Sequence, residues 1–140
     1  MRANQLIAAL AAAAALLAVA IGLYLGGSPL EERLLKLDER RVADLASLAA
    51  AIDAYWLAND ALPQTFNELV RARRLSHVPA DPVSGERYEY EAAAPDRYRL
   101  CATFDRATRE SDPAGFWTHE PGERCFDITL PANGPGAEAR

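Results

Sequence analysis

The opening segment of this chain contains no charged side chain from Ala3 to Leu30. This stretch exceeds the roughly 20 apolar residues that a helix needs to cross the hydrocarbon layer of a membrane. Its composition is mostly Ala with Leu, Ile and Val, and the Gly-Gly-Ser-Pro sequence at 26–29 then favours a break in the helix. We therefore expect a single transmembrane helix within residues 1–27.

Two other interpretations of this segment remain. A cleaved signal peptide would use Arg2 as its basic start and Ala18-Val19-Ala20 as its cleavage site. However, the apolar part of a signal peptide usually has about 7 to 15 residues, and here the apolar run continues to Leu25. A buried core helix would have to be enclosed on all sides, which a chain of 140 residues rarely achieves. An uncleaved anchor is the favoured interpretation.

Cys101 and Cys125 are the 2 cysteines of the chain. An even count behind an export-like helix favours a disulfide, and therefore an oxidising compartment such as a periplasm. Closing a loop of about 25 residues would stabilise the domain by roughly 3 kcal/mol. The alternatives are two unrelated buried thiols, or a metal site, which the positions of His77 and His119 do not favour.

The charges that flank the apolar segment give a weak indication of orientation. Only Arg2 and the amino terminus precede the segment, whereas several basic residues follow it, so a literal count opposes export. A long following domain is translocated largely regardless of charge, and the cysteines favour export. We predict a single-pass protein of a bacterial inner membrane, with a cytoplasmic N-terminus and a periplasmic or otherwise extracytoplasmic C-terminal domain.

Hydrophobic periodicity predicts two further helices. Apolar residues recur every three to five positions over residues 30–55, which is typical of a long amphipathic helix, and Asn59 should end it. The apolar stripe consists of Leu30, Leu34, Leu37, Val42, Leu45, Leu48, Ile52 and Tyr55. Thr65 and Glu68 have the spacing of a capping box, which predicts a short helix over 66–73.

Alternation of apolar and polar residues predicts three strands, at 87–91, 97–104 and 124–130. In this alternation Cys101 and Cys125 both fall on the outer face, so a cross-strand disulfide is expected if their Cα atoms lie within about 7 Å. The expected fold class is α+β: an N-terminal transmembrane helix, then a long amphipathic helix packed on a small three- to four-stranded antiparallel sheet.

Three parts of this domain occur in a characteristic order, namely AIDAYWLANDALP at 51–63, Leu69, and VPADPVSGERYEY at 78–90. Together they resemble the major pseudopilin of type II secretion systems. In that family a helix ending in Tyr and a Gly-x-Tyr-Pro-like stretch precede a Leu-rich segment, a Pro-x-Asp-Pro-Trp-Gly turn and a Tyr-x-Tyr strand. The resemblance covers roughly residues 43–100. It implies a pilin-like (type IV pilin-like) domain and a role in a secretion or pilus-like assembly.

The chain differs from that family at its amino terminus. Pseudopilins have a cleavage Gly followed by Phe-Thr-Leu-x-Glu, whereas this chain begins Met-Arg-Ala-Asn-Gln-Leu-Ile and has no Glu in its apolar segment. The turn also has Val83-Ser84 where the family has Trp. The resemblance therefore implies a pilin-like domain on an ordinary signal anchor, and it does not imply processing by prepilin peptidase or entry into a filament.

No catalytic constellation is recognisable in the sequence. Paired cysteines are not free nucleophiles, neither histidine has a partner at a recognisable spacing, and there is no Gly-rich phosphate loop. We expect no enzyme and no cofactor. The formal net charge of -5 would repel a phosphate backbone, so we expect no nucleic-acid binding.

Pseudopilins can bind calcium through acidic loop residues, so the resemblance raises the question of calcium in the segment 105–123, where carboxylate oxygens could serve as ligands. The candidate ligands are Asp105, Glu110, Asp112 and Glu120. Their spacing matches no known calcium loop, so we expect a solvated variable loop and no metal site. Phe116 and Trp117 in the same loop are candidate partner-binding residues, since aromatic residues are enriched at interaction hot spots. The alternative is that both rings pack over the sheet.

The sequence thus predicts a membrane anchor at 1–27, a pilin-like domain at 28–130 and a disordered tail at 131–140. Two functions are consistent with this organisation. The protein is a non-catalytic structural or accessory subunit of a secretion or pilus-like envelope assembly, or it is a free-standing, membrane-tethered periplasmic binding domain. Both have the membrane and other envelope proteins as partners, and oligomerisation is left open.

Overall fold

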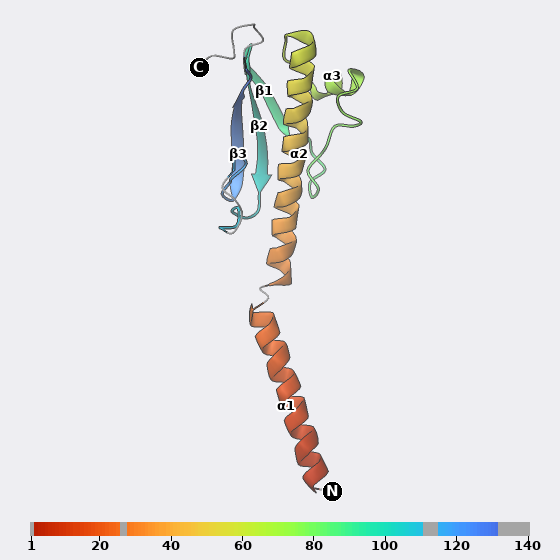
Figure 1. The fold of residues 1–140 in the computed structure, drawn as a ribbon, viewed down its shortest axis with the longest axis vertical. Coiled ribbons are helices and arrows are strands. Elements are labelled where there is room, and N and C mark those ends of the chain that lie inside the picture. Colours follow the sequence, from red (N-terminus) through yellow and green to blue (C-terminus); the bar gives the residue numbers. More distant parts are fainter. Residues whose placement is uncertain (1, 26–27, 111–114, 132–140) are drawn as a thin grey trace. The chain divides into compact units, whose positions relative to one another are not determined.

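The computed structural model describes residues 2–25, 28–110 and 115–131. Contacts between residues divide the chain into two compact units, Met1–Leu34 and Leu35–Arg140. Figure 1 shows the order of the elements, which is three helices followed by three strands. The predicted break at 26–27 lies outside the described residues, and so does the predicted tail, except for Pro131.

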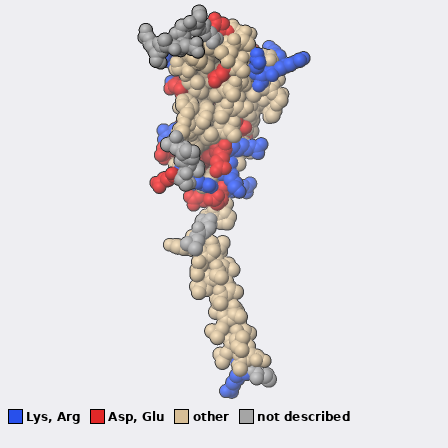
Figure 2. Space-filling view, in the orientation of Figure 1, with Lys and Arg blue, Asp and Glu red and all other residues tan. Residues whose placement is uncertain are grey.

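Helix α1 spans Arg2–Leu25 and has 24 residues, a length of about 36 Å at about 1.5 Å per residue. Its described side chains are all exposed. Its most apolar window has a mean hydropathy of 2.7, and none of that window is buried. In Figure 2 the helix is tan along most of its length, with blue only at its N-terminal end. By length and composition α1 can cross a membrane.

Helix α2 spans Pro29–Asn59 and supplies one side of the hydrophobic core. Leu45, Leu48 and Ile52 are fully buried, and their spacing of three and four residues places them on one face of the helix. The predicted stripe is therefore confirmed in this part of α2. Trp56 continues the face one turn further and is also buried, although the stripe predicted from the sequence did not include it.

The other layer is an antiparallel sheet with the strand order β1-β2-β3. Strand β1 spans Glu89–Ala94, β2 spans Arg97–Phe104 and β3 spans Gly122–Thr129. Alternate residues of β2 face the core. These buried residues are Tyr98, Leu100, Ala102 and Phe104. In Figure 1 the sheet lies along α2, so this unit has the α+β architecture that the sequence predicted.

Two strands differ in their limits from the sequence prediction. Strand β1 begins two residues later than expected, because Arg87 forms only an isolated bridge with Ala80 instead of joining the ladder. Strand β3 begins two residues earlier than expected, at Gly122, which pairs with Phe104 at the end of β2. Gly122 has a φ of 100°, a conformation that glycine adopts without strain. The glycine therefore allows the chain to enter β3 directly from the loop.

Helix α3 spans Phe66–Arg71, so it ends two residues before the predicted limit. The predicted capping box is wrong. Thr65 is the N-cap residue but makes no side-chain cap hydrogen bond, because the N–H of Glu68 donates to the Thr65 carbonyl oxygen at 3.1 Å. The Glu68 carboxylate accepts the N–H of Gln64 at 2.9 Å instead. Burial of Phe66 and Leu69 in the common core holds the helix in place.

Candidate functional site

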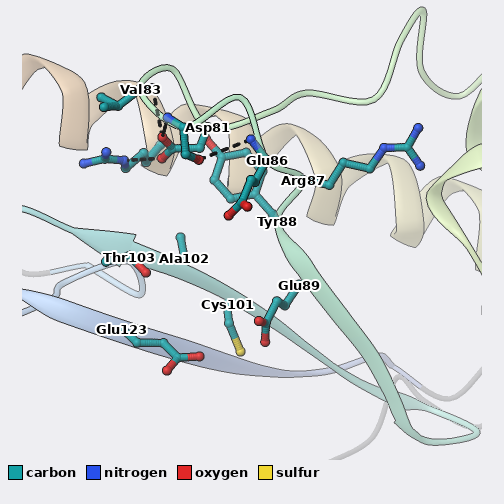
Figure 3. A pocket seen from close by; sticks show the side chains of 12 residues that line it. Asp81, Val83, Glu86, Arg87, Tyr88, Glu89, Cys101, Ala102, Thr103 and Glu123 are labelled. Carbon is teal, nitrogen blue, oxygen red and sulfur yellow. Dashed lines mark hydrogen bonds and ion pairs between the residues drawn. The ribbon is translucent and has the colours of Figure 1, made fainter.

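A disulfide joins the central strand β2 to the edge strand β3. Cys101 and Cys125 are directly paired in the sheet, and their Cα atoms are 4.0 Å apart. Cys101 is buried, whereas Cys125 is exposed. Figure 3 shows Cys101 pointing to the opposite side of the sheet from Ala102, as alternation requires. The bond therefore ties the strands together on the face away from α2.

The loop between β2 and β3 carries the two candidate partner-binding residues. Phe116 is 57% exposed, whereas Trp117 is half-buried against the core. Both rings contact Phe126 of β3, with centroid distances of 5.9 Å for Phe116 and 4.9 Å for Trp117. Trp117 thus has a packing role, and Phe116 leaves most of its ring available to a partner.

His119 fixes the end of this loop. Its ring stacks on Phe104 with a centroid distance of 3.7 Å. Nδ1 lies 2.9 Å from the Trp117 carbonyl oxygen, which can only accept, so Nδ1 carries the proton in the neutral imidazole. Nε2 is buried, and no described residue offers it a hydrogen-bond partner. The N–H of Thr108 donates to the His119 carbonyl oxygen at 2.9 Å, and the N–H of His119 donates to the Thr108 hydroxyl at 3.0 Å. These two hydrogen bonds close the base of the loop.

A cavity of about 300 Å³ lies between this loop and α2. Its apolar wall includes Leu35, Val42 and Trp117, and its polar wall includes Glu39 and Thr108. Pockets of this size and mixed character hold small ligands or single side chains of a partner. The exposed ring of Phe116 is adjacent in the chain to Trp117, so the loop and the cavity form one candidate interaction site.

A buried ionic network connects this loop to the rest of the domain. The Arg41 side chain is 6% exposed and donates from Nη1 to Asp38 at 2.7 Å and to Asp105 at 2.6 Å. Its Nε donates to Asp81 at 2.6 Å. The Asp38 carboxylate also accepts the backbone N–H groups of Asp105, at 3.0 Å and 3.1 Å, and of Arg106, at 2.7 Å. The network therefore joins α2, the turn at Asp81 and the end of β2.

Asp81 is held in its charged form. Burial by itself would raise the pKa of Asp81, but hydrogen bonds from Arg41 and from the N–H groups of Ser84 and Val83 lower it to about 2. Burial likewise would lower the pKa of Arg41, and its three carboxylate partners raise it above the ordinary value. These charges are therefore a fixed structural feature at neutral pH.

A second cavity, of about 350 Å³, lies beside this network and is drawn in Figure 3. Glu86, Glu89 and Glu123 contribute carboxylates to its lining, and Arg87 extends away from them. The cavity is open and strongly acidic. Among residues 2–25, 28–110 and 115–131, no group of three or more His, Cys, Asp or Glu side chains is arranged to hold a metal ion.

Tyrosines from the strand region contribute polar contacts to α2. The hydroxyl of Tyr88 donates to Asp44 at 2.9 Å and that of Tyr98 donates to Asp53 at 3.0 Å. Tyr90 donates to the Pro63 carbonyl oxygen at 2.7 Å. Burial, together with the nearby Glu68, raises the pKa of Tyr90 to about 12. The alternating tyrosines of the sequence therefore connect the strands to α2 and to the Pro63 segment.

The acidic residues considered for calcium do not converge in the described part of the chain. Asp105 is bound to Arg41, and Glu110 and Glu120 are exposed. Asp112 lies outside the described residues. The sequence analysis missed the ionic network, although Asp38 and Arg41 are three residues apart on a helix and so were recognisable as a local pair. Their partners beyond α2 leave no local sequence signal.

No protein-family model, no curated protein and no solved structure matches this chain. The resemblance to major pseudopilins therefore stays a prediction from the residues at 51–63, Leu69 and those at 78–90.

Proposed function

We propose that this protein is a membrane-anchored, non-catalytic, pseudopilin-like envelope protein that acts as a structural or accessory subunit of a secretion or pilus-like assembly. One observation carries the proposal, which is the order of the elements. An exposed apolar helix precedes a long helix, and a short helix and a three-stranded antiparallel sheet then cover that long helix. The same order of parts accompanies the pseudopilin-like motifs at 51–63 and 78–90.

Two features support an extracytoplasmic position for the sheet-containing unit. The disulfide between Cys101 and Cys125 fits an oxidising compartment. Helix α1 has the length and composition of a membrane span. In this proposal α1 anchors the protein in a bacterial inner membrane with a cytoplasmic N-terminus, and the core of α2 and the sheet folds outside the cytoplasm.

A second candidate function is a free-standing, membrane-tethered binding domain. The exposed Phe116 ring favours it, since aromatic residues are enriched at protein-binding hot spots and the next residue, Trp117, lines the cavity. This alternative needs no assembly partners in the membrane. It requires only that the loop between β2 and β3 recognises a ligand or an envelope protein.

Affinity purification of the full-length protein from gently solubilised native membranes distinguishes the two functions. Stoichiometric recovery of secretion or pilus components, identified by mass spectrometry, is expected if the protein is an assembly subunit. Recovery of the protein alone would refute that role. Recovery of one envelope protein that still binds after α1 has been removed would favour the tethered binding domain.

Phe116→Ala tests the loop in the same purification. Because the ring is largely exposed, we expect the free energy of unfolding to change by no more than about 0.5 kcal/mol, while capture of a partner by this loop falls at least about tenfold. Trp117→Ala is the matched comparison and should destabilise the domain by about 2 kcal/mol, because Trp117 packs on Phe126. Unchanged capture by Phe116→Ala would exclude the loop as the binding site.

A further inference from the structure

Three arginines form an exposed basic surface at the end of α3. Arg71, Arg73 and Arg74 are all exposed, and Figure 2 shows blue side chains gathered over α3. Within the described part of the chain none of the three forms an ion pair, whereas Arg41 and Arg99 are paired with carboxylates. This local concentration of unpaired positive charge contrasts with the formal net charge of -5 of the whole chain.

The backbone at this surface has a conformation that glycine would adopt at lower cost. The N–H of Arg73 donates to the Val70 carbonyl oxygen at 3.0 Å and that of Arg74 donates to the Leu69 carbonyl oxygen at 2.8 Å, which is the Schellman pattern of a helix end. Arg73 is the left-handed residue of that motif, with a φ of 56°. Glycine is strongly preferred there. The chain therefore places a long cationic side chain where the backbone conformation favours glycine.

The surface is also held in a fixed position. Phe66 and Leu69 of α3 are buried in the core, and Leu75 after the helix packs against it. The nearest carboxylate in the sequence, that of Glu68, already accepts the N–H of Gln64. Guanidinium groups bind carboxylates well, because each planar fork donates two parallel hydrogen bonds to one carboxylate.

We propose that Arg71, Arg73 and Arg74 are a docking site for a short acidic segment of another protein. Outside these three residues the chain carries a net charge of -8, given its total of -5. An anionic membrane or a second copy of this chain would present its charge to that acidic remainder and be repelled. A short segment that contacts only the arginines avoids this repulsion. This inference goes beyond the proposed function and does not depend on the class of assembly.

The test is binding of a fluorescent octaglutamate peptide to the detergent-solubilised full-length protein, with octaglutamine as the uncharged reference. Arg71→Gln/Arg73→Gln/Arg74→Gln should weaken octaglutamate binding at least about tenfold. The matched control removes the same charge at scattered exposed positions. Its substitutions are Arg40→Gln, Arg97→Gln and Arg124→Gln, and binding should stay within about twofold. Equal weakening by both triple variants would overturn the proposal, because it would show a response to net charge alone.

Two single variants separate binding from folding. Arg73→Gly should raise the melting temperature by about 4 °C and weaken octaglutamate binding about threefold. Arg73→Lys keeps the charge but loses the planar fork, so it should weaken binding less than Arg73→Gly does. Unchanged binding by Arg73→Gly would overturn the proposal. So would arginine-dependent binding to phosphatidylglycerol vesicles that matches or exceeds the peptide affinity, or arginine-dependent self-association. The first would indicate a membrane partner and the second would indicate another copy of the chain.

Discussion

The two long helices differ in whether other parts of the chain cover their surfaces. Every described side chain of α1 is exposed and nearly all are apolar, so no protein surface in the described structure covers them. Helix α2 instead presents buried apolar residues and two buried charges, Asp38 and Arg41, to the sheet and its loops. Each type of surface on α2 therefore has a counterpart elsewhere in the chain.

This difference indicates what each helix needs. An exposed apolar surface as long as α1 is unfavourable in water, and a hydrocarbon environment removes that cost. The surface of α2 is satisfied by the domain itself, and its buried charges are acceptable only because hydrogen bonds compensate them. The following predictions test these two requirements, beginning with the largest expected effect.

Charges in the centre of α1 should prevent this helix from inserting into a membrane. Leu16→Arg/Leu17→Arg should oppose insertion by about 6 kcal/mol, because each arginine at the centre of a span costs about 3 kcal/mol. The measurement is the fraction that resists alkaline extraction from membranes. Asn4→Arg/Gln5→Arg is the control, since arginines near a helix end can reach the interface. Full membrane retention of the central variant would contradict a spanning role for α1.

Removal of the Arg41 side chain should disrupt the ionic network that joins α2 to Asp81 and Asp105. Arg41→Met leaves three carboxylates without their cation, and we expect the free energy of unfolding to fall by about 4 kcal/mol. Urea denaturation at neutral pH measures the change. Arg40→Met, at the neighbouring exposed position, should change stability by no more than about 0.5 kcal/mol. Similar effects of the two variants would mean that the network adds little to the packing of α2.

Loss of the disulfide should weaken the sheet that covers α2. Cys101→Ala/Cys125→Ala should lower the free energy of unfolding by about 3 kcal/mol, because the unfolded chain is no longer constrained. Reduction of the wild-type protein by dithiothreitol should give a decrease of the same size. A change below about 1 kcal/mol in both measurements would show that the bond does not constrain the domain.

Acid should weaken the ionic network around Arg41, because Asp81 becomes protonated. Its folded-state pKa is about 2, against an ordinary value of 3.8, so the unfolded chain binds the proton more readily. The resulting stabilisation, about 2 kcal/mol, is present above pH 4 and is lost as the pH falls from about 4 to about 2. Asp81→Asn should flatten this part of the stability profile, whereas Asp96→Asn should preserve it. An unchanged profile in Asp81→Asn would contradict the assignment.

Local patterns in the sequence predicted the elements well. The spacing of Leu45, Leu48 and Ile52 identified the buried face of α2, and strand alternation placed Cys101 and Cys125 on one face of the sheet. These successes depend on periodicities of 3.6 and 2, which a sequence displays directly. The α+β class follows from the same patterns.

Features that depend on long-range contacts were not predictable in the same way. Arg41 meets Asp81 and Asp105, which are 40 and 64 residues away in the sequence, and no local pattern links them. The capping box failed because a backbone carbonyl took the N–H that the Thr65 hydroxyl was expected to receive. In the candidate site, the sequence singled out Phe116 and Trp117, but it could not predict that only Trp117 packs against the core, because that packing depends on residues far away in the chain.

We propose that α1 anchors the protein in a membrane and that the domain folds outside the cytoplasm. Alkylation of free thiols in intact cells, followed by alkaline extraction and mass spectrometry, tests both parts on one sample. We expect the protein to stay in the membrane pellet with Cys101 and Cys125 oxidised to the disulfide. Reduced, alkylated cysteines, or recovery of the protein in the soluble fraction, would contradict it.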